Sequence, residues 1–262
     1  MSKISVVTIS YNQGKYLRRC IDSVLSQRGV DLEMIVVDPG STDESRSIIS
    51  SYGDHVIPVF ESDTGPADGL NHGFRRATGQ IYYFVNADDF LLPDALSFVD
   101  HFFSREREVD VLHGGGYVAD QHDKLVRRYY PSLFGTRLFA YGAINLFQQG
   151  FFFRSGVYRA SGGFNEKNRV CWDGELFLQF KLRGSRFYGV SRPLAAFRRY
   201  QETITGGASY RRNLDIEYSR LFADAMGRAR KPYDRRLGQA LWGAKQFTIL
   251  FILLRSWVRG YA

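Results

Sequence analysis

Blocks of apolar residues alternate with amphipathic blocks over the first hundred positions and predict repeated strand–helix units. Continuous apolar runs predict buried strands at residues 4–9, 34–37, 56–60 and 81–85. Helices are expected between them, over 13–27, after an N-cap at Thr42 or Asp43, from Pro66 to Ala77, and from Pro93 to about Phe103. Four such alternations with short links indicate a doubly wound, mainly parallel α/β sheet with a nucleotide-sized crevice at the carboxyl edge.

The second half follows a less regular pattern. Strands are expected at 109–113 and 117–128 in a mixed or antiparallel arrangement, with Gly114 to Gly116 between them as a turn or close-approach loop. A helix is predicted over 174–184, and short strands over 187–190 and 194–200. After Gly206-Gly207 the chain is expected to turn helical and basic, which divides it into segments 1–95, 96–205 and 206–262.

A short acidic cluster, Asn86-Ala87-Asp88-Asp89, follows the fourth predicted strand. Adjacent carboxylates at the end of a strand repel each other, and a divalent cation relieves that repulsion. Oxygen ligands favour Mg²⁺ or Mn²⁺. The alternative is a polar turn ahead of the helix that Pro93 opens.

Composition narrows the class of protein. The 262 residues carry a formal charge of +8, which favours anionic partners such as nucleotide phosphates, nucleic acid or acidic lipid. Cys20 and Cys171 are far apart and the five histidines lack zinc spacing, so we expect reduced thiols and a cytoplasmic protein. We expect no signal peptide, no apolar stretch of the ~20 residues that span a bilayer, and no nucleic-acid partner, because no nucleic-acid module matches.

Polar loops at the ends of the four predicted strands form an ordered set, at residues 8–12, 38–43, 61–73 and 86–89. Their order and spacing resemble the family 2 glycosyltransferases, which are inverting enzymes of the GT-A fold. The resemblance implies a nucleotide-sugar-binding half over 1–95, an acceptor-binding and catalytic half over 96–205, and a C-terminal helical extension over 206–262.

The resemblance also implies roles in donor binding. The nucleotide would be contacted by Thr8, Ser10, Tyr11, Asp38, Asp68 and Asn71. Asp38 would accept a hydrogen bond from the base, although a turn aspartate that caps the next helix is an alternative that can coexist with this role. Asp68 and Asn71, three apart, would share one helix face, which is otherwise an exposed polar face. Asp88 would bind the cation, and Asp89 the donor sugar or a metal-bound water. The family's Asp-x-Asp motif becomes Asn86-Ala87-Asp88, which keeps an oxygen donor and loses one charge.

The same resemblance points to the catalytic side. Asp173 matches the catalytic base, which opens a helix after the segment Gly162-Gly163-Phe164; its other reading is a helix N-cap. Glu175 matches a second acid on the acceptor side, and two residues apart on a helix point to different sides. Gln149 is also expected on the acceptor side, next to Gln148 where related sequences often have histidine. Arg198 is expected at the diphosphate or as a surface strand arginine, and Tyr200 replaces the usual histidine of that segment.

These features imply an inverting transfer of a sugar from a nucleotide-sugar donor, a UDP-sugar favoured, to a hydroxyl of a glycan or lipid-linked acceptor. Bacterial-type surface glycan assembly is the expected process, with Mn²⁺ or Mg²⁺ as cofactor. Two alternatives remain: a nucleotidyltransferase, and a non-catalytic nucleotide-sugar-binding scaffold at a membrane.

The C-terminal apolar run at 247–254 is flanked by basic residues, with Trp242 and Trp257 nearby. It is too short to span a bilayer. It is expected either to lie in a membrane interface or to pack as a core helix on the sheet. The first reading gives a peripheral membrane contact through residues 242–259, at the inner face of the plasma membrane.

Overall fold

The computed structural model describes residues 1–200 and 208–262, so the predicted segment boundary at Gly206-Gly207 lies outside the described residues. The strands are β1 (Lys3–Ile9), β2 (Asp31–Val37), β3 (Ile57–Val59), β4 (Ile81–Asn86), β5 (Phe90–Leu91), β6 (Val111–Ala119), β7 (Leu125–Tyr129), β8 (Phe151–Arg154) and β9 (Phe187–Arg198). The α-helices are α1 (Gly14–Leu25), α2 (Ser45–Ser50), α3 (Pro66–Arg76), α4 (Ala95–Arg105), α5 (Thr136–Ala140), α6 (Ser155–Ser161), α7 (Trp172–Leu182), α8 (Ala208–Met226) and α9 (Pro232–Arg259). Two short 3₁₀ helices are η1 (Gly53–His55) and η2 (Gln148–Gly150).

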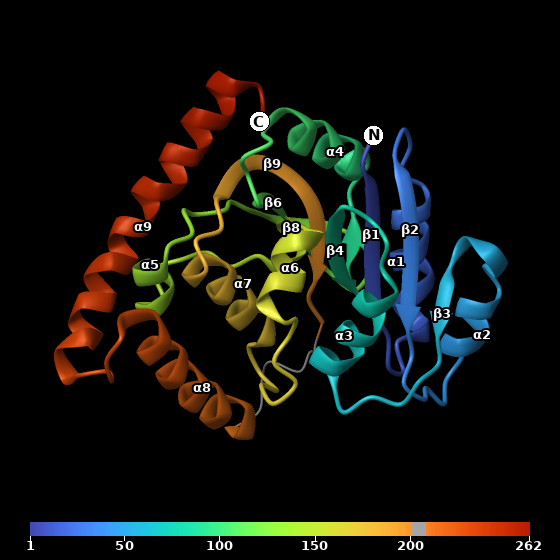
Figure 1. Ribbon diagram of the computed structural model, residues 1–262, viewed down its shortest axis with the longest axis horizontal. Helices are drawn as coiled ribbons and strands as arrows, with labels where there is room; N and C mark the ends of the chain where they lie inside the picture. Colours follow the sequence, from blue (N-terminus) through green and yellow to red (C-terminus); the bar gives the residue numbers. More distant parts are fainter. Residues whose placement is uncertain (201–207) are drawn as a thin grey trace.

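The strands form one mixed sheet in the order β3-β2-β1-β4-β8-β6-β9-β5, with β7 paired to β6. The first four neighbours are parallel, as the strand–helix alternation predicts. β8 runs antiparallel to both β4 and β6, and β9 runs parallel to β6 and curves over the sheet (Figure 1). The doubly wound half and the mixed second half are both confirmed.

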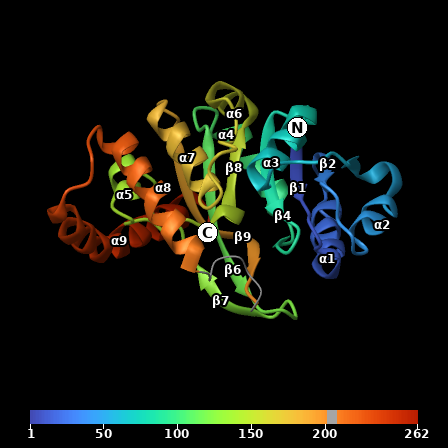
Figure 2. The same ribbon diagram turned by 90° about the horizontal axis from the view of Figure 1, so that it is seen from below.

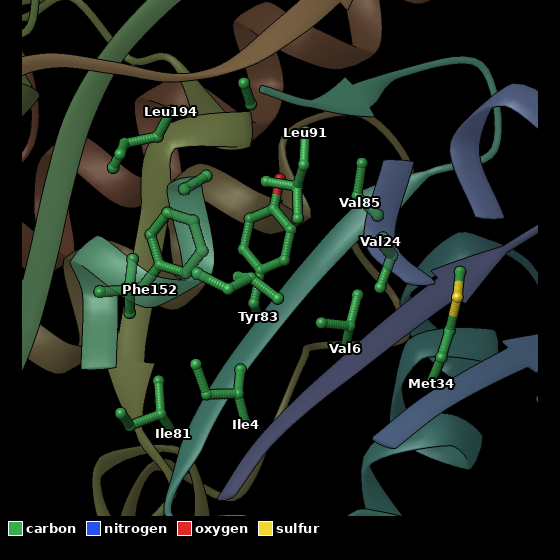
Figure 3. Packing of buried hydrophobic residues seen from close by; sticks show 14 of the residues in the cluster. Ile4, Val6, Val24, Met34, Ile81, Tyr83, Val85, Leu91, Phe152 and Leu194 are labelled. Atoms are coloured by element: carbon green, nitrogen blue, oxygen red, sulfur yellow. The ribbon is translucent and has the colours of Figure 1, made fainter. Parts of the chain in front are cut away.

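Alternate residues of the strands bury against two different sets of helices, because successive side chains of a strand point to opposite faces. One core contains Tyr83 and Val85 of β4 together with residues of α1, α2 and α4. The other contains Tyr82 and Phe84 with residues of α3, α6 and α7. Figure 3 shows the first core, in which the Tyr83 ring stacks on Phe152 of β8 with centroids 4.2 Å apart.

The predicted break at Gly114 to Gly116 is wrong in one respect, because these glycines lie inside β6. The strand expected at 109–113 and the first residues of the one expected at 117–128 form the single strand β6, and the rest of the second forms a turn and most of β7. The glycines let neighbouring chain approach closely: a Cβ on Gly115 would lie 2.8 Å from the carbonyl oxygen of Tyr129. A Cβ on Gly116 would lie 2.2 Å from the Phe147 ring. The strands expected at 187–190 and 194–200 are likewise one strand, β9, whose register against β6 shifts beside Gly115.

The chain ends in two helices, α8 and α9, gathered at the end of the molecule opposite α2 (Figures 1 and 2). α9 has 28 residues and is longer than the apolar run at 247–254. Within residues 1–200 and 208–262, it is the one helix long and apolar enough to cross a membrane by length and composition. This corrects the expectation that no such stretch exists.

Candidate active site

Polar side chains follow three neighbouring parallel strands at the point where each ends. Ser10 follows β1, Asp38 follows β2, and Asn86 with Asp88 closes β4. Because β1 lies between β2 and β4, these residues meet at one edge of the sheet. Two buried oxygens at this edge, Ser10 Oγ and Asp38 Oδ2, have no hydrogen-bond partner within the described residues. Buried polar atoms ordinarily find partners, so this edge is built to receive hydrogen bonds from a ligand.

Asp38 is fully buried and held by one of its two oxygens. Its Oδ1 accepts hydrogen bonds from the backbone N–H groups of Gly40 (3.0 Å) and Ser41 (2.8 Å) and from Nε of Arg46 (3.1 Å). The Arg46 guanidinium in turn lies over the ring of Phe60. Asp38 therefore has the predicted role in the turn, and its Oδ2 stays available to a ligand while Oδ1 is fixed.

Thr8 and Tyr11, on either side of Ser10 in the chain, differ in accessibility. Thr8 is fully buried, with Oγ1 3.9 Å from Sγ of Cys20 on α1. Tyr11 is 61% exposed, so its ring is accessible to a ligand at the edge. Asn12 joins the first two loops, because its Oδ1 accepts the backbone N–H of Thr42.

Asp68 and Asn71 both lie on α3 and are both buried, so the alternative of an exposed polar face does not apply. Asp68 Oδ2 accepts the N–H and hydroxyl of Thr64, and Oδ1 lies 3.1 Å from Nε2 of His72. Burial opposes ionisation, but these Thr64 hydrogen bonds lower the pKa of Asp68 below its ordinary value.

Both the nitrogen and the oxygen of the Asn71 side-chain amide make hydrogen bonds. Its Nδ2 donates to the carbonyl of Phe164 (3.0 Å), and its Oδ1 accepts from the Tyr158 hydroxyl (2.7 Å). These bonds fasten α3 to the segment that precedes α7.

The acidic loop after β4 divides its side chains between the edge and the interior. Asn86 and Asp88 are partly exposed, whereas Asp89 is fully buried. Asp89 Oδ1 accepts the backbone N–H of Arg198 (2.9 Å), and Oδ2 accepts Nε2 of Gln149 (2.7 Å). Burial and the neighbouring Asp88 raise the pKa of Asp89 well above its ordinary value. Asp89 therefore joins three segments that are distant in sequence.

Arg198 is almost fully buried beneath this loop, which excludes its reading as a surface strand arginine. Its Nε donates to the backbone carbonyl of Asp88 (2.8 Å), and it pairs with Asp123. Its guanidinium lies over the rings of Tyr16 (4.4 Å) and Phe90 (5.4 Å).

Tyr200 lies next to Asp88, the candidate ligand of the cation. Its hydroxyl donates to Oδ2 of Asp88 over 3.0 Å, and its ring lies 5.0 Å from that of Tyr16. Burial is the main cause that raises the pKa of Asp88, and the Tyr200 hydrogen bond partly offsets it.

The oxygen-bearing side chains after β4 suit a hard cation only when a bound ligand supplies further oxygen atoms. Within the described residues no group of three His, Cys, Asp or Glu side chains could hold a metal ion. Asn86, the last residue of β4, and Asp88, in the turn that follows, offer two partly exposed oxygen-bearing side chains close together in the chain. Mg²⁺ and Mn²⁺ commonly take one or two protein oxygens and complete their shell with phosphate oxygens and water. The residues therefore fit a cation that arrives with a diphosphate.

Asp173 lies in the first turn of α7, one residue after the N-terminal Trp172, and the N-cap itself is Cys171. Its Oδ1 accepts the N–H of Gly174 (2.8 Å), and burial raises its pKa above the ordinary value. The Trp172 ring packs 5.7 Å from Phe84 of β4, two residues before Asn86. This contact brings the start of α7 to the carboxyl end of β4.

Glu175 is buried in a network of its own. Its carboxylate accepts hydrogen bonds from Arg220 of α8 (2.6 Å), Asn168 (2.7 Å) and Asn165 (3.0 Å). Burial opposes ionisation, but these bonds, Arg220 first, lower its pKa. The two carboxylates of α7 thus have opposite environments.

The paired glutamines before β8 are also buried. Gln148 Nε2 donates to the carbonyl of Phe84 (3.0 Å), and Gln149 donates to Asp89. Both therefore support β4 and its loop from within. The arginine partners Arg46 and Arg220, with Asp123 and Tyr16, were missed by the sequence reasoning, because nothing local to these residues marks the group that each one contacts.

Comparison with known proteins places this site in a family. The model of glycosyl transferase family 2 matches residues 5–162. A PGL/p-HBAD biosynthesis glycosyltransferase of Mycobacterium tuberculosis is 27% identical over 258 residues, which cover 97% of this chain and 90% of that protein. An uncharacterized glycosyltransferase of Nostoc is 38% identical over 128 residues, or 47% of this chain and 39% of the relative. The chain thus spans well under half the length of the Nostoc relative, and 60% of a Rickettsia typhi glycosyltransferase.

Solved structures agree on the fold. Staphylococcus aureus TarS 1–349, crystallised with UDP-GlcNAc, matches with a TM-score of 0.68 at 18% identity, over 93% of this chain and 71% of that one. The mannosyltransferase PcManGT of Pyrobaculum calidifontis, in complex with GDP-Man and Mn²⁺, matches with a TM-score of 0.64 at 18% identity, over 98% and 73%.

Proposed function

The chain belongs to glycosyl transferase family 2 and has a GT-A-type fold, and we propose that it transfers a sugar, with inversion, from a nucleotide-sugar donor to a hydroxyl acceptor. A UDP-sugar is the favoured donor. The observation that carries the proposal is the edge where β1, β2 and β4 end, because Ser10 and Asp38 present unpartnered buried oxygens beside the partly exposed Asp88.

The donor fits this edge group by group. A pyrimidine base has an N–H that Asp38 Oδ2 can accept, and the exposed Tyr11 ring can pack beside the base. Thr8, Asp68 and Asn71 support the loops around the nucleotide from buried positions. Arg198 places a buried positive charge against the loop that faces the diphosphate.

Asn86 and Asp88 would hold Mn²⁺ or Mg²⁺ together with the donor's diphosphate. The bound cation would neutralise charge on the leaving diphosphate. The PcManGT complex with GDP-Man and Mn²⁺ supports this part of the proposal. Asp89, whose own oxygens are both engaged, acts on the donor sugar through the loop that it fixes.

Asp173 serves as the base in the transfer itself. The acceptor oxygen attacks C1 of the sugar, its proton passes to the Asp173 carboxylate, and the bond from C1 to the diphosphate oxygen breaks. The nucleoside diphosphate leaves with the electron pair of that bond. A raised pKa suits Asp173 to accepting a proton, since a base works best when its pKa is nearer to the operating pH.

The acceptor in this proposal is a glycan or lipid-linked hydroxyl used in surface glycan assembly, at the cytoplasmic face of a membrane. The name of the mycobacterial relative, for PGL/p-HBAD biosynthesis, supports a glycan product. Gln149 and Glu175 act on the acceptor side through the segments that they hold in place. Contact with a membrane through residues 242–259 belongs to the same proposal.

A thermal-shift titration of the purified chain with UDP-, dTDP- and GDP-sugars, each with and without Mn²⁺, tests the proposal. A ligand that binds the native state raises the melting temperature in proportion to its affinity and concentration. We expect a Mn²⁺-dependent rise with UDP-sugars that is lost in Asp38→Ala and kept in the control Asp54→Ala, which changes an exposed aspartate in η1. No rise with any nucleotide would contradict donor binding at this edge.

A further inference from the structure

α9 presents a continuous apolar face that no described part of the protein covers. The face consists of Phe247, Leu250, Phe251, Leu254, Trp257 and Val258. Their spacing of three and four residues places them on one side of the helix. Phe247 is 75% exposed and Trp257 76%, whereas large apolar side chains of monomeric proteins rarely gather in the open.

The opposite side of α9 is fastened to the body along its length. Asp234, near the start, accepts hydrogen bonds from Tyr141 and Arg228. Ser256, near the end, accepts the backbone N–H of Ser191 through its hydroxyl. Tyr261, just past the helix, donates to Glu106. These contacts fix which side of the helix faces outward. They also oppose a transmembrane insertion, because leaving the body would break them.

The charge of the protein is concentrated on the same segment. Residues 228–262 contain eight lysines and arginines and one acidic residue, Asp234. The segment therefore carries seven of the eight net positive charges of the chain, because one of its eight positive charges is offset by Asp234. Asp234 is itself buried and paired with Arg228. The exposed basic residues of the segment are Arg230, Lys231, Arg235, Arg236 and Arg259, so its outward surface is basic as well as apolar.

A basic pocket of about 330 Å³ lies near the start of α9, ahead of the apolar face along the helix. Its walls are Tyr141, Arg230, Arg235, Gly238, Gln239 and Trp242. The residues that line it include two guanidinium groups and an amide, and no carboxylate. Such a lining suits a phosphate group. An exposed tryptophan at its rim is typical of side chains that lie at the level of lipid headgroups.

We propose that α9 docks the protein onto an anionic phospholipid bilayer, with its apolar face in the headgroup–acyl boundary and a lipid phosphate in the Arg230–Arg235 pocket. A second copy of the chain is a poorer occupant, because pairing two such faces would bring two strongly basic segments together. This docking rests on the proposed function for its acceptor. It adds to that function the class of lipid and the surface that contacts it.

The test is co-sedimentation of the full chain with vesicles of phosphatidylcholine alone and with 30% phosphatidylglycerol, at low and high salt. We expect binding that needs the anionic lipid and weakens with salt. Phe247→Ser/Trp257→Ser should bind at least tenfold more weakly, while Ile216→Ser, at an exposed apolar position of α8, should bind as the wild type does. Arg235→Glu/Arg236→Glu should also lose binding, unlike the charge-matched control Arg28→Glu/Arg107→Glu.

Soluble glycerol phosphate separates the two sources of phosphate: competition by it at millimolar concentration would show a pocket for free phosphate and overturn the lipid assignment. Wild-type protein that stays in the supernatant, or a dimer that Phe247→Ser/Trp257→Ser dissociates without changing vesicle binding, would also overturn it. Donor thermal shifts, measured on the same variants, should match the wild type. If the wild type binds vesicles but its melting temperature does not rise with any donor, the proposed function is contradicted and the docking surface is supported.

Discussion

At the scale of single residues, surroundings decide which of two similar carboxylates can do chemistry. Asp173 and Glu175 are two positions apart on α7. Glu175 is held ionised by Arg220 and two asparagines, whereas Asp173 has a raised pKa and accepts a hydrogen bond from the backbone N–H of Gly174. A carboxylate locked in an ion pair is a poor proton acceptor, which supports the proposal that Asp173 rather than Glu175 is the base.

We therefore expect Asp173→Asn to lower the transfer rate by roughly 10²–10⁴-fold, since the amide keeps the shape and cannot accept the proton. Donor affinity should stay within a factor of two or three. Steady-state kinetics and a donor thermal shift on the same preparation measure both quantities. An Asp173→Asn enzyme with full turnover would refute the assignment.

The sequence predicts such residues better than it predicts their partners. A helix-start aspartate after two glycines is visible in the sequence, and so is the acidic cluster at Asp88. The hydrogen bond from Arg198 to the loop joins residues 110 positions apart, and no local pattern encodes it. The burial of Asp89 was missed for the same reason, because its two partners come from η2 and the end of β9.

At the scale of elements, periodic patterns predicted the first half well because each strand there pairs with a parallel neighbour and is covered by its own helix. β6 and β9 were each split in two, because glycine and proline signals inside them resemble turns. Gly115 and Pro193 in fact pair within the sheet, at a register shift that the sequence does not display. The first residues of α2 and α4 also lie one or two positions later than predicted.

The glycines of β6 give a test of this packing. Gly116→Ala would place a methyl group 2.2 Å from the Phe147 ring and 2.4 Å from the Ala195 carbonyl oxygen. We expect a loss of about 2–3 kcal/mol in the free energy of unfolding, measured by urea denaturation. Gly156→Ala on α6 meets nothing within 4 Å and should be neutral or stabilising by up to ~1 kcal/mol. Equal effects would show that β6 does not pack as described.

Arg220 of α8 supports α7 through its ion pair with Glu175. Arg220→Ala leaves the buried Glu175 carboxylate without its charged partner, which should cost about 1–3 kcal/mol of stability because Arg220 is partly exposed. We expect kcat to fall several-fold while donor affinity is unchanged, since α7 carries Asp173. Arg220→Lys should restore part of both losses. A change in donor affinity without a change in kcat would contradict this positioning role.

At the scale of the whole molecule, the amino ends of the strands carry a polar network far from the active edge. Glu33 accepts hydrogen bonds from Ser5 and Thr78 and pairs with Lys3 at 2.8 Å. Burial opposes ionisation, but the bonds from Lys3, Ser5 and Thr78 lower the pKa of Glu33 to about 2. The network joins β1, β2 and the turn before β4.

Because the folded pKa of Glu33 lies below its ordinary value of 4.5, its contribution to stability is complete above pH 4.5 and is lost as the pH falls toward 2. Glu33→Gln should therefore lower the melting temperature at pH 7 and flatten its decline between pH 5 and pH 2. The control Glu108→Gln changes a side chain that is 81% exposed. A decline as steep in Glu33→Gln as in the wild type would exclude this carboxylate as the cause.

The order of strands in the sheet also sets when the enzyme becomes competent during its synthesis. β5 follows the acidic loop directly, yet its neighbour in the sheet is β9. Asp89 likewise accepts a hydrogen bond from the backbone N–H of Arg198, which is synthesised 109 positions later. At ordinary translation rates that interval is roughly 5–20 s. The nascent parallel half can fold on the ribosome, but its acidic loop stays open until the last strand emerges. We therefore expect a chain cut short before β9 to be inactive, so that catalytic competence marks a nearly finished polypeptide.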